Sequence, residues 1–315
     1  MRIFRHDRVA AGERGAVVAL GNFDGVHLGH QQVIGEAGAI ARRLGVPSAV
    51  LTFEPHPRRV FRPQDPPFRL TPFRMKARRI EALGVDLLFT LHFDGDFAQR
   101  SAEAFIDEVL VGGLGLRHAV VGYDFVFGHQ RRGNPALLAE RGAALGFGVS
   151  VIDPVGAAGG ALYSSTRIRE HLVAGRPREA AALLGRFWEI DGRVERGDQR
   201  GRTIGFPTAN IFLHDYLRPA AGVYAVRAAV EEDGRPRWYD AVANFGTRPT
   251  FGGSDLRLEV HLFDFAGDLY GRHLRVALIE HLRPERKFPG VDALKAQIAE
   301  DAAKAREILR SVPAF

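Results

Sequence analysis

Cysteine is absent from this chain, which excludes disulfide bonds, thiolate nucleophiles and cysteine-ligated metal sites. No apolar run approaches the ~20 residues that a membrane-spanning helix needs. The N-terminal residues 1–7 are charged and lack an apolar segment, so we expect no secretion signal and a cytoplasmic protein. No Gly-Lys dipeptide occurs, which excludes a Walker A loop, and no His-Glu-x-x-His sequence supports a zinc site. Any nucleotide site must therefore be of another type.

The length and charge of the chain limit the number of domains and the classes of protein to which it can belong. Its 315 residues allow one or two domains, and 46% hydrophobic residues suffice for real cores. The net charge of +6 suits nucleic acid, a membrane surface or an anionic small molecule. The basic residues are mostly scattered among Asp and Glu, without a basic arm or tail. An enzyme that uses nucleotides accounts for this charge as well as a nucleic-acid-binding protein does.

The most informative segment is Gly-Asn-Phe-Asp-Gly-Val-His-Leu-Gly-His at residues 21–30. It follows the apolar run 16–20 and precedes a helical pattern, so a buried strand, a turn and a helix start are expected. His27 and His30 are three residues apart and share one helix face. The first helical turn offers unpaired N–H groups and partial positive charge, which suits phosphate. Two surface histidines or half a metal site are the alternatives, and the strand–turn–helix context favours phosphate.

Strand-like and helix-like segments alternate through the first half of the chain, which predicts a parallel α/β sheet. Ligands of such sheets bind outside the carboxyl ends of the strands, where residues 21–30 fall. The expected strands are 16–20, 48–53, 86–91, 118–122 and 149–153, and the expected helices end at Gly45, begin near Ser101, and cover 136–145 and 177–184.

The second half has a different pattern. Beyond Gly185, segments such as 222–227 alternate with the two-residue period of half-buried strands, and Gly, Pro and Asp turns separate them. This pattern predicts a compact antiparallel barrel or sandwich that ends in one helix, from about 291 to 309. We place the domain boundary near Gly185, which gives domains of residues 1–185 and 186–315.

Two further segments of the first half follow predicted strands. A Phe-Glu-Pro-His-Pro loop presents His56 at the sheet edge, although a structural proline-rich loop explains it equally well. In Gly-Tyr-Asp-Phe-Val-Phe-Gly, the aromatic side chains can stack on a flat ring and Asp124 can supply a polar contact. For at least one of Phe125 and Phe127 we expect core packing instead.

A third segment, Ser-Ser-Thr-Arg at 164–167, precedes a helical pattern. Its serines are typical helix caps. Thr166 and Arg167 add phosphate donors at a second helix start. Two helix starts that converge on one triphosphate suit phosphoryl chemistry, which needs donors on more than one side.

The second half carries its own polar segment, from Gly197 to Asn210. Three glycines at four-residue spacing allow backbone N–H groups to face an anion, although a turn-rich loop also explains them. Thr208 and Asn210 point the same way from an extended chain, and their oxygens suit a hard cation such as Mg²⁺.

A strand at 256–262 places alternate leucine and valine side chains on one face and leaves Glu259 on the other. Glu259 can serve as a general base, and a solvated carboxylate is the alternative. The polar loop 244–250 is a further candidate for a pocket wall, or a simple turn.

These segments resemble a known family. Residues 21–30, the Phe-Glu-Pro-His-Pro loop, Gly-Tyr-Asp-Phe-Val-Phe-Gly and Ser-Ser-Thr-Arg-Ile-Arg resemble the adenylyltransferase module of bacterial bifunctional riboflavin kinase/FAD synthetases. The segments Gly-Arg-Thr-Ile-Gly-Phe-Pro-Thr-Ala-Asn, Asn-Phe-Gly-Thr-Arg-Pro-Thr, Leu-Glu-Val-His-Leu and Asp-Leu-Tyr-Gly resemble the riboflavin kinase module. The resemblance spans essentially the whole chain. It implies a Rossmann-like α/β nucleotidyltransferase domain, then an antiparallel β-barrel kinase domain with a terminal helix.

The resemblance implies two ATP-dependent reactions: phosphorylation of riboflavin to FMN by the second module, and transfer of AMP to FMN by the first, giving FAD and pyrophosphate. It implies Mg²⁺ as cofactor and neither nucleic acid nor membrane as partner, and it leaves the oligomeric state open. It makes His27 and His30 catalytic in the first module, and Glu259 the base in the second. The remaining implied contacts are with ATP for Gly21, Asn22, Phe23, Asp24, Ser165, Thr166, Arg167, Gly197, Gly201, Arg202 and Thr208, with flavin for His56, Asp124, Phe125, Asn244 and Arg248, and with metal for Thr208 and Asn210.

Two residues depart from the family pattern. Val126 stands where a polar residue is common, and Asn134 where aspartate is frequent. Both concern how the FMN phosphate is held in the first module. Three alternatives remain open from the sequence: another acceptor for the first module, a nucleic-acid-binding barrel, or one degenerate module that leaves a single activity. No aromatic and basic stripe supports the second of these.

Overall fold

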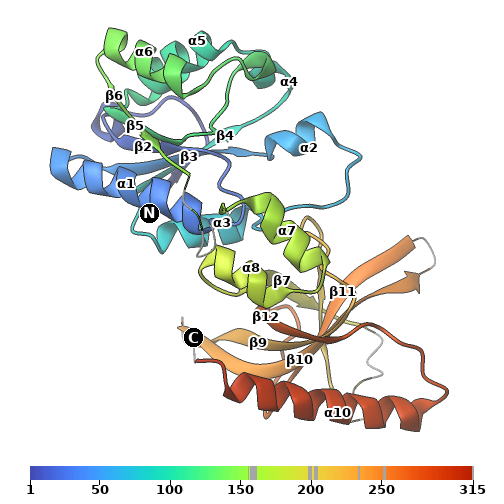
Figure 1. Cartoon of the computed structure of the whole chain (residues 1–315). Coiled ribbons are helices and arrows are strands. Elements are labelled where there is room, and N and C mark those ends of the chain that lie inside the picture. Colours follow the sequence, from blue (N-terminus) through green and yellow to red (C-terminus); the bar gives the residue numbers. More distant parts are fainter. Residues whose placement is uncertain are drawn as a thin grey trace. The chain divides into compact units, whose positions relative to one another are not determined.

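A six-stranded parallel sheet forms the centre of the first half of the chain, with strand order β1-β4-β3-β2-β5-β6 (Figure 1). The computed structural model describes residues 1–154, 156, 162–197, 201, 205–232, 235–250 and 253–313, without the side chains of 11, 247–250 and 253–255. The strands are β1 (Arg2–Phe4), β2 (Val17–Leu20), β3 (Ser48–Glu54), β4 (Leu87–His92), β5 (His118–Gly122) and β6 (Gly148–Ile152).

The five strands expected from the sequence are confirmed, and β1 is an addition. β1 is only three residues long and pairs in parallel with one edge of β4. Its residues are exposed or partly buried, so no apolar run marks it in the sequence. The central strands β2 and β3 are buried almost throughout, as a sheet covered on both faces requires.

Helices cover both faces of this sheet (Figure 1). They are η1 (Ala11–Glu13), α1 (Leu28–Leu44), α2 (Pro57–Phe61), α3 (Phe73–Glu81), α4 (Gly95–Ala98), α5 (Ala102–Ala104), the π-helix η2 (Phe105–Leu114), η3 (His129–Arg131) and α6 (Pro135–Leu145). Gly45 ends α1 with a positive φ of 66°, and Ser101 caps α5, as the sequence predicts.

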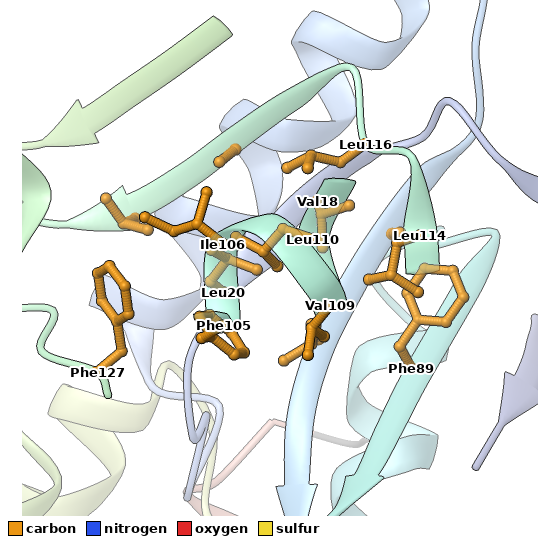
Figure 2. Close-up of a cluster of buried hydrophobic side chains, with 14 of the residues drawn as sticks. Val18, Leu20, Phe89, Phe105, Ile106, Val109, Leu110, Leu114, Leu116 and Phe127 are labelled. Atoms are coloured by element: carbon orange, nitrogen blue, oxygen red, sulfur yellow. The ribbon is translucent and has the colours of Figure 1, made fainter. Parts of the chain in front are cut away.

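Two apolar clusters hold the helices on the sheet. On one face, η2 packs against alternate residues of the strands, and Figure 2 shows Ile106, Val109 and Leu110 beside Val18 and Leu20 of β2. On the other face, α1 and α3 cover the intervening residues of β2, β3, β4 and β5. Each fully buried side chain of this size contributes roughly 1.5–3 kcal/mol. The sheet is therefore a fixed base for the loops at its carboxyl edge.

The second half forms a closed antiparallel barrel with strand order β10-β11-β8-β7-β12-β9. The predicted choice between barrel and sandwich is thus resolved in favour of the barrel. Its strands are β7 (Trp188–Glu195), β8 (Ala209–Phe212), β9 (Gly222–Glu232), β10 (Arg235–Thr250), β11 (Gly253–Leu262) and β12 (His273–Arg283), and its helices are α7 (Ser165–Val173), α8 (Pro177–Leu184) and α10 (Val291–Arg310).

The terminal helix α10 is fixed to the barrel by an ion pair and by hydrogen bonds to backbone carbonyls. Arg227 of β9 donates to the Asp240 carboxylate and to the carbonyls of Leu309 and Val312 near the end of α10. Arg283 donates to the Asp301 carboxylate, with Arg283 Nη2 2.7 Å from Asp301 Oδ2. Arginine near a helix C-terminus satisfies the last carbonyls. Arg227 therefore holds the backbone at the end of α10, and Arg283 holds it through the Asp301 carboxylate.

The chain divides into two compact units, Met1–Pro66 with Thr71–Ser164, and Pro67–Leu70 with Ser165–Phe315. The short segment Pro67–Leu70 joins the second unit because its backbone is bonded there: Leu70 accepts from Trp188 Nε1 at 2.8 Å, and Arg69 from Leu217 N at 2.8 Å. The functional boundary near Gly185 stays a prediction. Within the described ranges, no helix has the length and apolar character needed to cross a membrane.

Candidate active sites

The loop between β2 and α1 holds an unusual backbone conformation. Phe23 and Val26 have positive φ values of 49° and 43°, on either side of Gly25 at 89°. Such values cost of order 1–3 kcal/mol each for residues with a Cβ. Asp24 holds the loop, because its buried Oδ1 accepts from Thr71 N at 2.9 Å, while Gly25 N donates to Thr71 Oγ1 at 2.8 Å. Strain retained by specific hydrogen bonds is typical of ligand-binding loops.

His27 and His30 come together at the start of α1, as the sequence predicts. His27 is the N-cap, and its Nδ1 accepts from the backbone N–H of His30 at 3.3 Å. The two rings are stacked, with centroids 3.5 Å apart and planes 19° apart. Because Nδ1 of His27 is an acceptor, its neutral imidazole carries the proton on Nε2 and presents a donor there. The pair therefore adds imidazole groups to a helix N-terminus, where N–H groups already favour an anion.

The glycine between these histidines lies in a tight space. A Cβ on Gly29 would lie 3.3 Å from Cε1 and Nδ1 of His27 and 3.3 Å from Cβ of Tyr163. Phe23 borders the pair from the other side, edge-on to His30 with ring centroids 5.3 Å apart. The ring of His27 is thus held in place by its cap bond and by its neighbours, and it is only 6% exposed.

A buried lysine that the sequence analysis missed lies beside this loop. Lys76 of α3 is fully buried; its Nζ lies 3.2 Å from Glu54 Oε1 and donates to Thr52 Oγ1 at 3.2 Å. Thr52 in turn donates to the carbonyl of Asn22 at 3.1 Å. The ammonium group therefore connects α3, the end of β3 and the loop at 21–27. No local motif marks this lysine, since only the fold brings the partners together.

The candidate flavin contacts of the first unit follow β3 and β5, the two strands that flank β2. His56 is buried, and its Nδ1 accepts from Arg58 N at 3.1 Å as the N-cap of α2. Asp124 is exposed in the turn after β5. Phe127 is part of the core, as expected for at least one of the two phenylalanines, and Phe125 stacks on it at 5.3 Å. Flavin contact by these residues stays a prediction.

The structure also places three predicted ATP contacts and Asn134, one of the two residues that depart from the family pattern. Ser165, Thr166 and Arg167 open α7, which belongs to the second compact unit, and their contact with ATP stays a prediction. Asn134 caps α6, with Oδ1 accepting from Leu137 N at 3.0 Å. Asparagine caps a helix as well as aspartate does, which explains how the first unit accepts it at this position.

In the barrel, strand register brings three polar residues into one row. Glu259 of β11 pairs with Asn210 of β8 on one side and with Asn244 of β10 on the other. Paired residues of adjacent strands have Cβ atoms about 4.5–5.5 Å apart and point to the same face. Leu258 and Val260, the neighbours of Glu259 in sequence, are fully buried inside the barrel. Glu259 therefore lies on the outer face, between two carboxamides, as its alternation predicts.

Close backbone contacts shape the surroundings of Asn210. A Cβ on Gly197 would lie 2.6 Å from Asn210 Nδ2, so only glycine allows this approach. Thr208 stands two residues before Asn210 and is partly buried, and Gly201 accepts from Phe206 N at 2.8 Å. Arg202 and the side chain of Arg248, two predicted contacts, lie outside the described residues.

Two more groups on this face were missed from the sequence. Glu285 accepts from Asn244 Nδ2 at 3.3 Å, and its carboxylate occupies the space above Gly246. His261 is bonded through Nδ1 to the carbonyl of Pro207 at 2.8 Å. The alternation that selects Glu259 also selects His261, but nothing in the sequence connects Glu285 to a residue 41 positions earlier.

No cluster of three or more His, Cys, Asp or Glu side chains suited to a metal occurs in the described part of the chain. A cation site would have to use other oxygens. Thr208 and Asn210 supply a hydroxyl and an amide oxygen, which fit a hard cation that is also held by phosphates. These two residues therefore fit a divalent ion that arrives with ATP.

Comparison with known proteins assigns a class to each unit. The family model of FAD synthetase matches residues 10–167, and that of riboflavin kinase matches residues 184–309. The bifunctional riboflavin kinase/FMN adenylyltransferase of Escherichia coli K12 is 42% identical over 98% of this chain and 97% of its own length. The Bacillus subtilis protein of the same name is 39% identical, covering 95% and 94%. The chain belongs to the bifunctional riboflavin kinase/FMN adenylyltransferase family.

A solved structure shares the fold along its full length. It is named a macrolide-efflux protein, from Streptococcus pneumoniae, and it is 31% identical with a TM-score of 0.84 over 99% of this chain and 100% of that one. The two family models and the curated relatives, rather than that name, support the family assignment. Both predicted modules are thus present in their predicted order.

Proposed function

We propose that this chain phosphorylates riboflavin to FMN with ATP in its barrel unit, and then transfers AMP from a second ATP to FMN in its α/β unit. The observation that carries the proposal is the match of both family models over a chain that aligns with bifunctional relatives end to end. Each unit also contains its own constellation of polar residues. The match of both models argues against the alternative in which one module is degenerate.

In the barrel unit, Glu259 is the candidate base. A phosphoryl group passes from ATP when the riboflavin hydroxyl oxygen bonds to the γ-phosphorus, the bond to the bridging oxygen breaks, and ADP leaves. The hydroxyl proton goes to the Glu259 carboxylate. Asn210 and Asn244 are its cross-strand neighbours on either side, so the strand register places the carboxylate between two carboxamides. A general base placed in this way contributes about 10²–10⁴-fold to the rate.

The hydroxyl of Thr208 and the amide oxygen of Asn210 would hold Mg²⁺ together with the phosphates of ATP. A bound Mg²⁺ ion neutralises charge on the phosphates during transfer. The chain's own contribution is to place these two oxygens on one side of an extended strand end, next to the base. Gly197, packed on the Asn210 side chain, limits how that side chain can turn. Gly201 and Arg202 are the further ATP contacts that we propose here, with Arg248 on the flavin.

In the α/β unit, a phosphate oxygen of FMN would bond to the α-phosphorus of ATP, and pyrophosphate would leave with the electron pair of the broken bond. His27 and His30 would donate to the phosphoryl oxygens as charge develops there. Backbone groups of Gly21, Asn22 and Phe23 would contact the nucleotide. Asp24 would position the loop that contacts ATP, since its carboxylate accepts a hydrogen bond from Thr71 N. Ser165, Thr166 and Arg167 would contact the phosphates, and His56, Asp124 and Phe125 the flavin.

We also propose a cytoplasmic location, where both reactions have ATP. Product analysis with riboflavin, ATP and Mg²⁺ tests the two-site proposal. His30→Ala should lower adenylylation by about 10²–10³-fold, so that FMN accumulates. Glu259→Gln should lower riboflavin phosphorylation by about 10²–10⁴-fold, while added FMN still becomes FAD. If either substitution stops both reactions in folded protein, the two-site proposal fails.

A further inference from the structure

Arg257 shares the outer face of β11 with Glu259, two positions away. Its register partners are Phe212 of β8 and Gly246 of β10, so it occupies the row next to that of Asn210, Glu259 and Asn244. Residues two apart on a strand are about 6.5 Å apart along the strand, which an arginine side chain spans. Arg257 therefore lies on the same outer face as Glu259, in the adjacent row.

The burial of Arg257 is not explained by its protein contacts. The residue is only 7% exposed, and its guanidinium lies over the Phe212 ring, 5.4 Å from the centroid. Its Nε is buried and, within the part of the chain that the structure describes, has no hydrogen-bond partner. A buried charged donor without an acceptor is costly, and such groups in native proteins have a specific reason.

Arg227 provides the comparison within the same barrel. It is buried to the same degree, at 8% exposed, and its guanidinium donates to the Asp240 carboxylate and to backbone carbonyls. Arg227 is thus a structural arginine with its donors used inside the protein. Arg257 differs because its guanidinium lies over the Phe212 ring while Nε lacks an acceptor among described residues. A guanidinium with donors available is suited to phosphate oxygens.

The charge around Glu259 supplies the reason for a cation here. Glu285 lies above Gly246, the register partner of Arg257, so two carboxylates flank this part of the outer face. A phosphoryl group that approaches Glu259 brings further negative charge toward both of them. Repulsion between these groups would raise the barrier unless a cation offsets it.

We propose that Arg257 contacts the phosphoryl group during its transfer from ATP to the riboflavin hydroxyl. The guanidinium donates hydrogen bonds to the nonbridging oxygens of the γ-phosphoryl group, whose negative charge is spread over them in the transition state. The bonds made and broken are those of the kinase step given above, and Arg257 neither gains nor loses a proton. This proposal rests on the proposed kinase activity of the barrel.

The test compares Arg257→Gln and Arg257→Lys in the full-length chain. For Arg257→Gln we expect kcat for FMN formation to fall by about 10²–10³-fold, the loss typical of one charge-stabilising donor. The KM for riboflavin should stay within about twofold, because the contact forms with phosphoryl oxygens. Arg257→Lys should recover part of kcat, since it keeps the charge without the planar donors. FMN should inhibit Arg257→Gln less strongly than wild type as a product competing with riboflavin.

Arg237→Gln is the matched control. Arg237 is also a barrel arginine over an aromatic ring, 5.1 Å from the Tyr239 centroid, but its side chain is 67% exposed. Its loss should leave both reactions unchanged. Adenylylation of added FMN by each variant reports on the first unit, and tryptophan fluorescence reports on the barrel, because both tryptophans, Trp188 and Trp238, belong to β7 and β10.

Three outcomes would overturn the proposal. The first is a folded Arg257→Gln that keeps kcat within about threefold of wild type. The second is a rise in the KM for riboflavin that matches any loss in kcat/KM, which would make Arg257 a packing or flavin-binding residue. The third is unfolding of the barrel by both Gln and Lys, which would make the residue structural. Failure of wild type itself to phosphorylate riboflavin would instead refute the kinase function.

Discussion

At the scale of single residues, each site relies on a polar side chain whose position is fixed by the backbone. His27 accepts from the N–H of His30, so one histidine is at once a helix cap and a candidate contact for a ligand. Glu259 is fixed by strand register between Asn210 and Asn244. In both arrangements, a backbone hydrogen bond or a strand pairing places the residue. Such preorganisation is the main source of transition-state stabilisation at phosphoryl-transfer sites.

His118, the first residue of β5, makes stability depend on pH. Its pKa lies below the ordinary value of 6.5 because the ring is partly buried, and the positive charge of Arg43 adds to this effect. The folded state therefore favours the neutral ring, while the unfolded chain takes up a proton near pH 6.5. The free energy of unfolding of the first unit should be highest above about pH 6.5 and fall as the pH decreases below it.

His118→Gln should flatten this slope, because glutamine can keep a hydrogen bond to Ser150 Oγ, now 2.9 Å from His118 Nε2, without a charge change. The measurement is urea unfolding at pH 7.5 and 5.5, followed by far-UV circular dichroism. Tryptophan fluorescence of the barrel is the internal control and should not respond to the substitution. An unchanged pH slope of the first unit in the variant would refute the role of His118.

The catalytic candidates were predictable where one short segment contains the whole signal. His27 and His30 share a helix turn, and Glu259 is marked by strict alternation with buried leucine and valine. Lys76 and Glu285 were not predictable, because their partners are distant in sequence: Lys76 donates to Thr52, and Glu285 accepts from Asn244. Pairings of this kind depend on which elements the fold places side by side.

At the scale of elements, Lys76 links α3 and β3 to the histidine loop. Its ammonium group is fully buried beside Glu54 and donates to Thr52 Oγ1. Thr52 in turn donates to the Asn22 carbonyl. Lys76→Met should lower the free energy of unfolding of the first unit by about 3 kcal/mol, because it removes the buried ammonium group beside the Glu54 carboxylate. Adenylylation should fall as well, since the loop loses a support, and riboflavin phosphorylation should be unaffected.

The comparison requires two further variants. Lys295→Met removes an exposed lysine from α10 and should change neither stability nor activity. Lys76→Met combined with Glu54→Gln removes both charges and should recover part of the lost stability, as measured by urea unfolding. A free energy of unfolding for Lys76→Met within 1 kcal/mol of wild type, a threshold set by ordinary surface substitutions, would contradict the proposed link.

The predicted elements of the first half differ from the observed ones by a residue or two at their ends. In the second half, β9 and β11 extend beyond the predicted segments 222–227 and 256–262, and the prediction of a loop at 244–250 was wrong, because these residues belong to strand β10. Helix α8 begins and ends where the proline at its start and Gly185 at its end predict. The exceptions have physical causes. β1 has no apolar run because it lies at the sheet edge, and the bonding of Pro67–Leu70 to the second unit depends on contacts with Trp188 and Leu217 that no local pattern reveals.

At the scale of the whole molecule, two sites on one chain should act as separable catalysts. The fold supports this expectation, because the sheet and the barrel have separate apolar cores and each contains its own polar constellation. The change in hydrophobic period near Gly185 predicted an α/β half followed by an antiparallel barrel or sandwich, and the family resemblance supplied the order of the two modules. The division of contacts at Ser164 was not predictable, since it depends on how α7 packs with α8 rather than on its sequence.

The most direct measurement mixes two variants that are each defective in one reaction. His30→Ala with riboflavin, ATP and Mg²⁺ should accumulate FMN, and Glu259→Gln under the same conditions should form almost no product. A mixture of the two should form FAD, because the first variant supplies the FMN that the second adenylylates. Absence of FAD from the mixture, with both proteins folded, would contradict the claim that the two reactions have separate sites.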